Sequence, residues 1–234
     1  MSPDMLILAA LCIPLLIAVG IAAAGSFPNI REGVTIVGSV ILLGVVIALA
    51  VAVSNGESPA LDLGAAAPGL SFAFKLEPLG ALFALVASGL WIVNSFYSIG
   101  YMRGNRERNQ TRFYICFAVA IFGAIGVAMS GNLFTLFVFY EVLTLSTYPL
   151  VAHKGDAAAK RGGRIYLLTL LGTSIGLFLT ALMWTWTLAG QNLDFVPGGL
   201  LAGVDISPAV STALLLLFAF GIGKAALMPV HFWL

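Results

Sequence analysis

Seven mostly apolar stretches of 18 to 24 residues constrain the fold of this chain more than any other feature of its sequence. A transmembrane α-helix needs about 20 such residues to cross the hydrocarbon core of a bilayer. Only 9% of the 234 residues are charged, which is too few to cover the surface of a soluble domain. The sequence therefore predicts an all-α membrane protein that forms one transmembrane domain over residues 1–234. The seven spans are expected at about 5–24, 34–53, 79–99, 113–130, 132–151, 165–188 and 209–228.

The first apolar stretch is expected to be a retained transmembrane helix. A cleaved secretory signal peptide begins with basic residues, whereas the only charged residue ahead of this stretch is Asp4. The small residues from Ala22 to Gly25 resemble a cleavage site, so a signal peptide is the alternative interpretation. The missing basic residues favour the retained helix.

The loops between the predicted spans differ strongly in charge. Seven spans place successive loops on alternate sides of the membrane, and one side then carries nine basic residues while the other carries Lys75 alone. Basic residues accumulate on the cytoplasmic side of membrane proteins. The asymmetry predicts an outside N-terminus and a cytoplasmic C-terminus. The nine residues are Arg31, Arg103, Arg106, Arg108, Arg112, Lys154, Lys160, Arg161 and Arg164.

The polar segment between the second and third spans contains a pattern typical of a strand. Large apolar side chains alternate with small or polar ones from Leu70 to Leu76. A period of two favours a β-strand over a helix. We expect a short amphipathic strand here, at the membrane surface.

One carboxylate interrupts the fifth apolar stretch. Glu141 lies nine residues into that helix, about 14 Å deep at 1.5 Å per residue. A charge near the middle of a bilayer costs about 2.5–3.5 kcal/mol even on insertion scales, so such residues usually mark an ion pathway or a paired site. The helical period places further polar residues on the same face as Glu141. They are Tyr140, Thr144, Thr147 and Tyr148. The pattern favours a polar pathway, and a static interhelical hydrogen bond at Glu141 is the alternative.

One basic residue lies within the seventh apolar stretch. Gly221 and Gly223 precede Lys224, and Pro229 follows it. Glycine and proline loosen a helix, and freed backbone groups are tolerated in a membrane only where they face protein or a water-filled cavity. The sequence therefore predicts a broken seventh helix with Lys224 as a candidate proton carrier. The alternative is that Lys224 extends to the membrane interface. All charged residues other than Glu141 and Lys224 are expected in loops or at the termini.

No pattern in the sequence indicates a metal, a cofactor or an enzyme. Cys12 and Cys116 lie in apolar stretches without ligand-like spacing to His153 or His231, so we expect two small buried hydrophobic residues. The segment that ends at Lys224 lacks the full GxxxxGK[ST] spacing of a phosphate loop. No nucleophile–base pair is found, and a net charge of +1 gives no indication of nucleic acid. We therefore expect no catalytic residue, metal site, cofactor or nucleic-acid partner.

The segments around the two interior charges resemble a known family. NLFTLFVFYEVLTLSTYPLV, residues 132–151, and FGIGKAALMPVHFWL, residues 220–234, are similar to the antiporter-like membrane subunits shared by Mrp cation/proton antiporters and respiratory complex I. Within this family they resemble the D-type subunits of Mrp antiporters in particular. The resemblance covers about residues 71–234, the N-terminal half of a family member. The family's usual Asp-Pro-Leu-Gly motif is replaced by a glutamate-containing form at Glu77–Gly80.

The resemblance implies roles for three residues. The family's fifth-helix glutamate matches Glu141, and its lysine on a broken seventh helix matches Lys224. In the family, the glutamate modulates the proton affinity of the lysine, and protons pass along a hydrophilic axis in the middle of the membrane. A histidine that some D-type members lack matches His231. The resemblance thus predicts a proton relay of Glu141, Lys224 and His231, and the four polar residues beside Glu141 are expected to line it.

The resemblance also predicts the surroundings of the chain. We expect a multi-pass subunit of the inner (plasma) membrane that takes part in proton translocation within a multi-subunit monovalent cation/proton antiporter. Its expected partners are the lipid bilayer, other integral membrane subunits, H⁺ and, in an antiporter, Na⁺. One alternative is a proton-pumping subunit of a redox-driven complex such as complex I or a membrane hydrogenase, and another is a transport-inactive structural subunit. Family members continue with further helices and relay lysines, so we expect a partner that supplies the C-terminal half.

Overall fold

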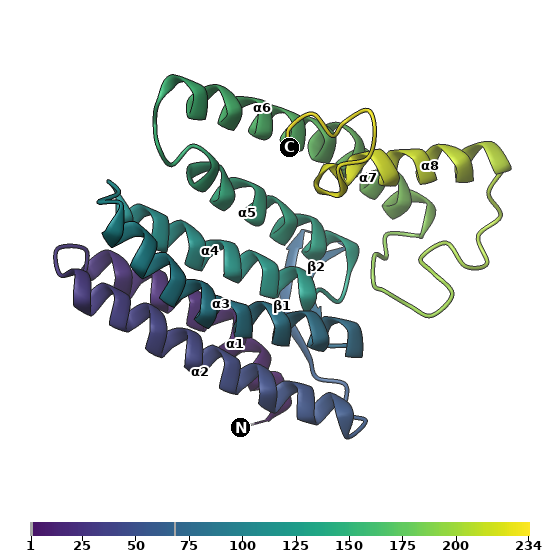
Figure 1. Ribbon diagram of the computed structural model, residues 1–234. Coiled ribbons are helices and arrows are strands. Elements are labelled where there is room, and N and C mark those ends of the chain that lie inside the picture. Colours follow the sequence, from purple (N-terminus) through teal and green to yellow (C-terminus); the bar gives the residue numbers. More distant parts are fainter. Residues whose placement is uncertain (1, 68) are drawn as a thin grey trace. The chain divides into compact units, whose positions relative to one another are not determined.

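The computed structural model describes residues 2–67 and 69–234 of the chain and is built mainly from helices (Figure 1). The first part of the chain contains α1 (Pro3–Ala23), α2 (Pro28–Ser54), β1 (Ala60–Ala67), β2 (Leu70–Lys75), α3 (Pro78–Gly104) and α4 (Gln110–Ala128). The second part contains α5 (Leu133–Val151), α6 (Ala157–Thr173), the π-helix η1 (Ser174–Phe178), α7 (Leu179–Leu188), α8 (Pro208–Gly221) and the 3₁₀-helix η2 (Gly223–Ala225).

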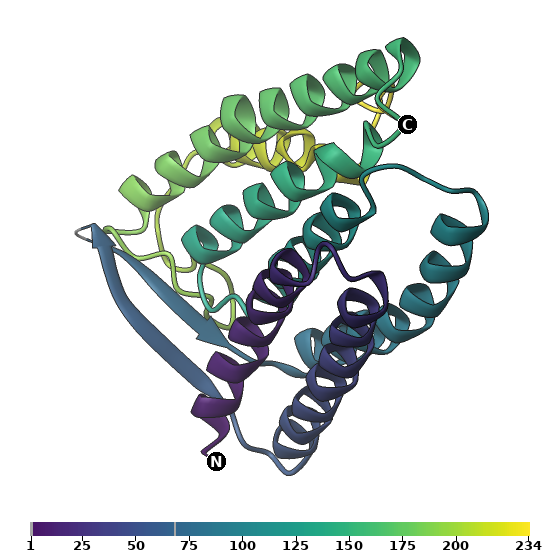
Figure 2. The ribbon, with the colours of Figure 1, turned by 90° about the vertical axis from the view of Figure 1, so that its left-hand side faces the viewer.

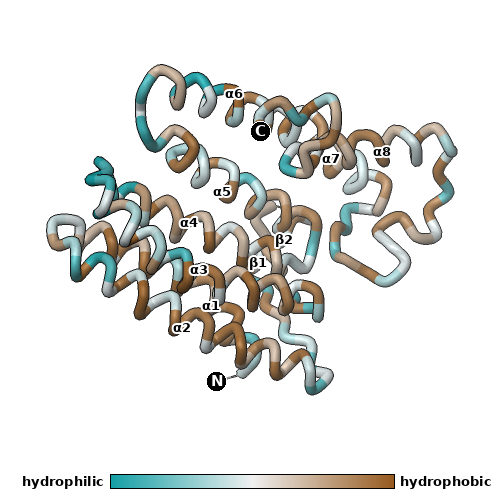
Figure 3. The backbone as a smooth tube through the Cα atoms, in the orientation of Figure 1, coloured by the Kyte–Doolittle hydropathy of each residue, from teal (hydrophilic) through white to brown (hydrophobic). Residues whose placement is uncertain are grey.

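Six continuous helices in the described part of the chain are long and apolar enough to cross a membrane. One of them, Ala157–Leu188, is formed by α6, η1 and α7 without interruption. Polar residues gather at loops and helix ends (Figure 3). The seventh helix, α8, has only 14 residues and ends in the middle of its apolar stretch. The predicted all-α membrane fold with a broken seventh helix is therefore confirmed.

Local sequence signals explain where several helices begin. Proline occupies the first turn of α1, α2, α3 and α8, where its missing N–H would have no helical partner in any case. Asn132 caps α5, because its side-chain oxygen accepts a hydrogen bond from the Thr135 N–H at 2.7 Å. Asp156 caps α6 in the same way through the Ala159 N–H, also at 2.7 Å.

The two strands pair with each other (Figure 2). The strand expected over Leu70–Leu76 is confirmed as β2. Its partner β1 was not expected from the sequence, because most of its residues are small and exposed and do not alternate. Pairing with β2 provides backbone hydrogen bonds that no local pattern encodes.

The described chain divides into two compact units. Unit 1 comprises residues 1–61 and 74–130, and so includes α1 to α4. Its core is formed by residues that are almost fully buried on facing helices. Among them are Ile7 and Ile21 of α1, Leu42 and Leu49 of α2, Trp91 of α3 and Ile125 of α4.

Unit 2 comprises residues 62–73 and 131–234, and so includes α5 to α8. Its core contains Leu170, Phe178, Leu182 and Leu214. Both interior charges found in the sequence belong to this unit. The single transmembrane domain expected over the whole chain stays a prediction.

Candidate functional site

The helix break that follows α8, the seventh predicted span, lies against the π-helix η1. At Gly221, a side-chain Cβ would come within 2.6 Å of the Phe178 backbone nitrogen, so only glycine allows this close approach. The Gly221 position thus fixes the end of α8 on the backbone of η1. A π-turn inside an α-helix is uncommon and is frequently found at functional sites.

An aromatic cluster surrounds this contact. Phe178 is 2% exposed, and its ring packs edge-on against three other rings. Its centroid lies 5.5 Å from that of Phe137, 5.8 Å from that of Tyr140 and 5.9 Å from that of Phe218. This packing holds α5, η1 and α8 together beside the break.

Two aromatic side chains hydrogen-bond to the backbone groups freed by the break. The Lys224 backbone N–H donates to the Tyr140 hydroxyl at 3.1 Å. The Gly223 carbonyl accepts a hydrogen bond from the Trp233 indole N–H at 3.1 Å. Unsatisfied backbone groups are costly inside a membrane. The unwound segment is therefore stabilised by partners from other segments.

The Lys224 side chain turns inward onto α5. Its ammonium group donates to the Tyr140 backbone carbonyl at 3.1 Å and to the Thr144 hydroxyl. The same nitrogen lies 3.4 Å from the centroid of the Tyr140 ring, in a cation–π contact. All of these partners are electrically neutral. The cation is thus solvated by protein groups without a carboxylate in direct contact.

Glu141 has a different environment from its neighbours on α5. Both carboxylate oxygens are buried, and neither has a hydrogen-bond partner among the described residues. No ion pair within 4.0 Å joins Glu141 to Lys224 in the described structure, but the two charges interact electrostatically over a longer distance. Unit 2 therefore contains a buried carboxylate without a hydrogen-bond partner and an ammonium group whose direct partners are all neutral.

The other residues predicted to belong to the site lie in varied surroundings. The Thr147 and Tyr166 hydroxyls are 2.6 Å apart, and the Tyr166 ring packs against Trp233 with centroids 5.5 Å apart. Tyr148 lies beside Gly163, where an added Cβ would be 3.1 Å from its ring. His231 is exposed and makes no side-chain hydrogen bond or ion pair with any described residue. The structure brings Tyr140 and Thr144 to Lys224, and leaves His231 outside these contacts.

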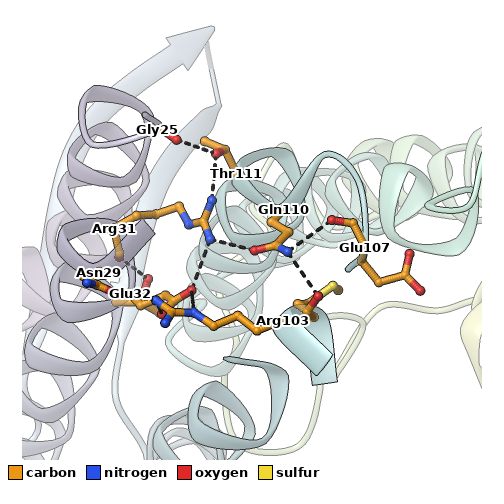
Figure 4. Close-up of polar contacts among 10 residues, drawn as sticks. Gly25, Asn29, Arg31, Glu32, Arg103, Glu107, Gln110 and Thr111 are labelled. Carbon is orange, nitrogen blue, oxygen red and sulfur yellow. Dashed lines mark hydrogen bonds and ion pairs between the residues drawn. The ribbon is translucent and has the colours of Figure 1, made fainter. Parts of the chain in front are cut away.

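A second buried charge cluster lies in unit 1 and was not predicted from the sequence (Figure 4). Glu32 accepts from Arg31 at 3.2 Å and from the Arg103 Nε at 3.0 Å. A further Arg103 nitrogen, Nη2, donates to the other Glu32 oxygen. The expectation that only Glu141 and Lys224 are interior charges is wrong, because α2 begins earlier than its apolar run and buries Arg31 and Glu32 close to its N-terminal end. Arg31 and Glu32 are adjacent in the sequence just before the apolar stretch of α2, and this was the signal from which the buried cluster could have been predicted.

The Arg31 guanidinium extends this cluster to α4 (Figure 4). It donates to the Thr111 hydroxyl at 3.1 Å and to the Gln110 side-chain oxygen at 2.9 Å. The Gln110 amide in turn donates to the carbonyls of Met102 and Glu107, both at 3.1 Å. The cluster therefore fastens the ends of α2, α3 and α4 to one another.

Two family models match the chain. Residues 130–234 match the model described as "NADH:quinone oxidoreductase/Mrp antiporter, TM". Residues 66–114 match the model described as "NADH-Ubiquinone oxidoreductase (complex I), chain 5 N-terminus". The first match includes all the residues around Lys224 described above.

Individual relatives agree with these matches. The N-type subunit of NADH-quinone oxidoreductase from Desulforudis audaxviator is 31% identical over 212 residues, which cover 89% of this chain and 41% of the relative. The D-type subunit of the Na(+)/H(+) antiporter from Alkalihalophilus pseudofirmus is 26% identical with the same coverage of both chains. A chain in the structure of the Mrp complex from Dietzia superposes with a TM-score of 0.74 at 25% identity, over 100% of this chain and 43% of the other. The chain thus spans less than half the length of each of these proteins.

Proposed function

Because the chain belongs to the family of antiporter-like membrane subunits that Mrp antiporters and complex I share, we propose that it takes part in proton translocation within a multi-subunit membrane complex. In this proposal Lys224 is the proton carrier, and Glu141 modulates it. Tyr140 and Thr144 solvate the carrier, while Thr147 extends the polar face of α5 and contacts the Tyr166 hydroxyl of α6. His231 is a further member of the proposed relay, although no contact in this unit supports it.

The neutral solvation of the Lys224 ammonium carries the proposal. A lysine paired directly with a carboxylate cannot lose its proton without leaving a buried, unpaired anion, which is strongly unfavourable. Lys224 instead donates to a carbonyl and a hydroxyl, which stay neutral whether or not the proton is present. Its charged and uncharged forms can therefore exchange without breaking a buried ion pair.

The position of Glu141 supports a modulating role. An unpartnered buried carboxylate is unfavourable for folding, so a purely structural residue at this site would be expected to have a hydrogen-bond donor. Glu141 has none among the described residues, yet it interacts electrostatically with Lys224. A change of charge at Glu141 would consequently alter how readily Lys224 holds its proton.

The proposal extends to the coupled ion, the membrane and the partners. The similarity to a D-type subunit of an Na(+)/H(+) antiporter and to the Mrp complex favours cation/proton antiport, in the inner membrane and beside other integral membrane subunits. The similarity to an NADH-quinone oxidoreductase subunit favours a redox-driven complex as the second candidate. Purification of the protein with its native neighbours separates the two, because antiporter subunits accompany the first and redox subunits the second.

The test compares transport by the native complex carrying Glu141→Gln, Lys224→Ala or both. Loss of a residue that handles the proton is expected to slow transport roughly 100-fold or more. If the two charges are coupled, the double variant should lose less activity than the product of the two single effects. Glu57→Gln, at an exposed loop position, is the matched control and should transport normally. Wild-type transport by Glu141→Gln and Lys224→Ala would refute the proposed relay.

A further inference from the structure

We propose that Tyr140 is the positioning residue of this site. It fixes the direction of the Lys224 side chain because it contacts both the backbone N–H and the ammonium group of Lys224. The inference deepens the proposed function and rests on it for the role of Lys224. Its structural content, that the Tyr140 hydroxyl holds the unwound segment after α8, can be tested independently.

Tyr140 contacts Lys224 at three points. Its hydroxyl accepts the backbone N–H at 3.1 Å, its carbonyl accepts from Nζ at 3.1 Å, and its ring lies 3.4 Å from Nζ. Lysine is a point charge on a flexible stem, so a single contact leaves it many conformations. Contacts at the backbone and at the ammonium restrict the stem between them. Tyr140 thus restricts the side chain at both ends, and the Thr144 hydroxyl adds a further acceptor at the ammonium end only.

Tyr140 is itself held firmly. The residue is buried, and its ring packs edge-on against Phe178 with centroids 5.8 Å apart. Its carbonyl also accepts a hydrogen bond from the Thr144 hydroxyl at 3.0 Å. When Lys224 is uncharged, this second donor still satisfies the carbonyl. Tyr140 is therefore suited to both protonation states of the lysine.

The hydroxyl distinguishes this position from its aromatic neighbours. Phe137 and Phe139 lie on the same helix and offer only rings. A phenylalanine at position 140 would keep the ring and the carbonyl but would leave the Lys224 N–H without its acceptor. An unpaired N–H beside a helix break in a membrane is unfavourable. The unwound segment would then move away from α5 more often.

The experiment measures hydrogen–deuterium exchange and transport for Tyr140→Phe in the native complex. We expect amide exchange over residues 222–227 to become roughly 2- to 10-fold faster, the range that one hydrogen bond supplies. Transport should slow by a similar factor, and its pH profile should change shape because the lysine is less well positioned. Tyr97→Phe, which alters an exposed tyrosine of α3 in unit 1, is the matched control and should change neither quantity.

The outcomes separate the two proposals. Unchanged exchange in Tyr140→Phe would overturn the positioning role. Faster exchange in Tyr140→Phe, together with wild-type transport by both Tyr140→Phe and Glu141→Gln, would support the positioning contact. The same result would refute the relay instead. Lys224→Met provides a second check that leaves Tyr140 unaltered. It keeps the backbone hydrogen bond and should raise exchange less than Tyr140→Phe does, and an equal or larger rise would also overturn the proposal.

Discussion

Unit 1 and unit 2 each bury a glutamate carboxylate, but only the glutamate of unit 1 has hydrogen-bond partners among the described residues. Glu32 accepts hydrogen bonds from two guanidinium groups, those of Arg31 and Arg103. Both oxygens of Glu141 lack a partner among the described residues, although Lys224 lies in the same unit. The cations differ in the same way, since Arg31 contacts a carboxylate directly and Lys224 contacts only neutral oxygens and a ring.

We propose that this difference separates a structural charge cluster, around Glu32, from one that takes part in proton transfer, around Lys224. Paired and hydrogen-bonded buried ions hold helices in register, and removal of one partner leaves the other uncompensated. A buried charge without a direct counter-ion is unfavourable for folding, so its presence at Glu141 is better explained by the proposed role in proton transfer than by stability. We therefore expect substitutions in the Glu32 cluster to lower stability, and substitutions at Glu141 to change transport.

The largest expected effect on stability is that of Glu32→Gln. The variant removes the anion between Arg31 and Arg103, and the loss of one member of a buried ion cluster costs about 3–5 kcal/mol. Thermal unfolding of the purified protein, with Glu57→Gln as the exposed control, measures the loss. A change as small as that of an exposed ion pair, below about 1 kcal/mol, would show that the cluster does not hold these helix ends.

The next effect concerns the packing that fixes the helix break in unit 2. Gly221→Ala would place a methyl group 2.6 Å from the Phe178 backbone, and overpacking of this kind costs about 1–3 kcal/mol. Gly44→Ala, inside α2 with no atom within 4 Å of the added group, is the control. It should gain up to about 1 kcal/mol from helix propensity. Equal unfolding temperatures for the two variants would contradict the close contact between α8 and η1.

A smaller effect is expected for Arg103→Lys. Lysine keeps the charge but cannot form the forked contact that arginine makes with both oxygens of Glu32. Because the Arg103 side chain is 45% exposed, water replaces part of the lost interaction, and we expect a loss of about 1 kcal/mol. Chemical denaturation of the two proteins side by side gives the value. A loss as large as that of Glu32→Gln would mean that the Arg103 contacts dominate the cluster.

The smallest effect on stability is expected for Glu141→Gln, the same substitution that is most damaging in unit 1. A neutral amide is less costly to bury than a carboxylate without a partner. The unfolding temperature should consequently stay the same or rise. A clear fall would reveal a stabilising partner for Glu141 and would remove the contrast between the two glutamates.

Much of this architecture follows from the sequence alone. Hydropathy over about 20 residues predicts the spans, because lipid excludes any backbone that does not satisfy its own hydrogen bonds. The alternation in Leu70–Leu76 predicts β2, and Gly221, Gly223 and Pro229 predict the break before Lys224. Each of these features is local, so the residues that determine it are neighbours in the chain.

The partners of the buried charges were decided by the tertiary structure. Tyr140 and Lys224 are 84 positions apart, and Glu32 and Arg103 are 71 positions apart. Helical periodicity placed Tyr140 and Thr144 on the same face as Glu141, but it could not show that they face Lys224 while Glu141 makes no direct contact with it. Nor could it show that Arg31 and Glu32 are buried, because the burial of a helix end depends on which other helices pack beside it. The sequence determines which helices carry the charges, and packing between distant segments determines whether a buried charge has an ion-pair partner, as Glu32 does, or none, as Glu141 does.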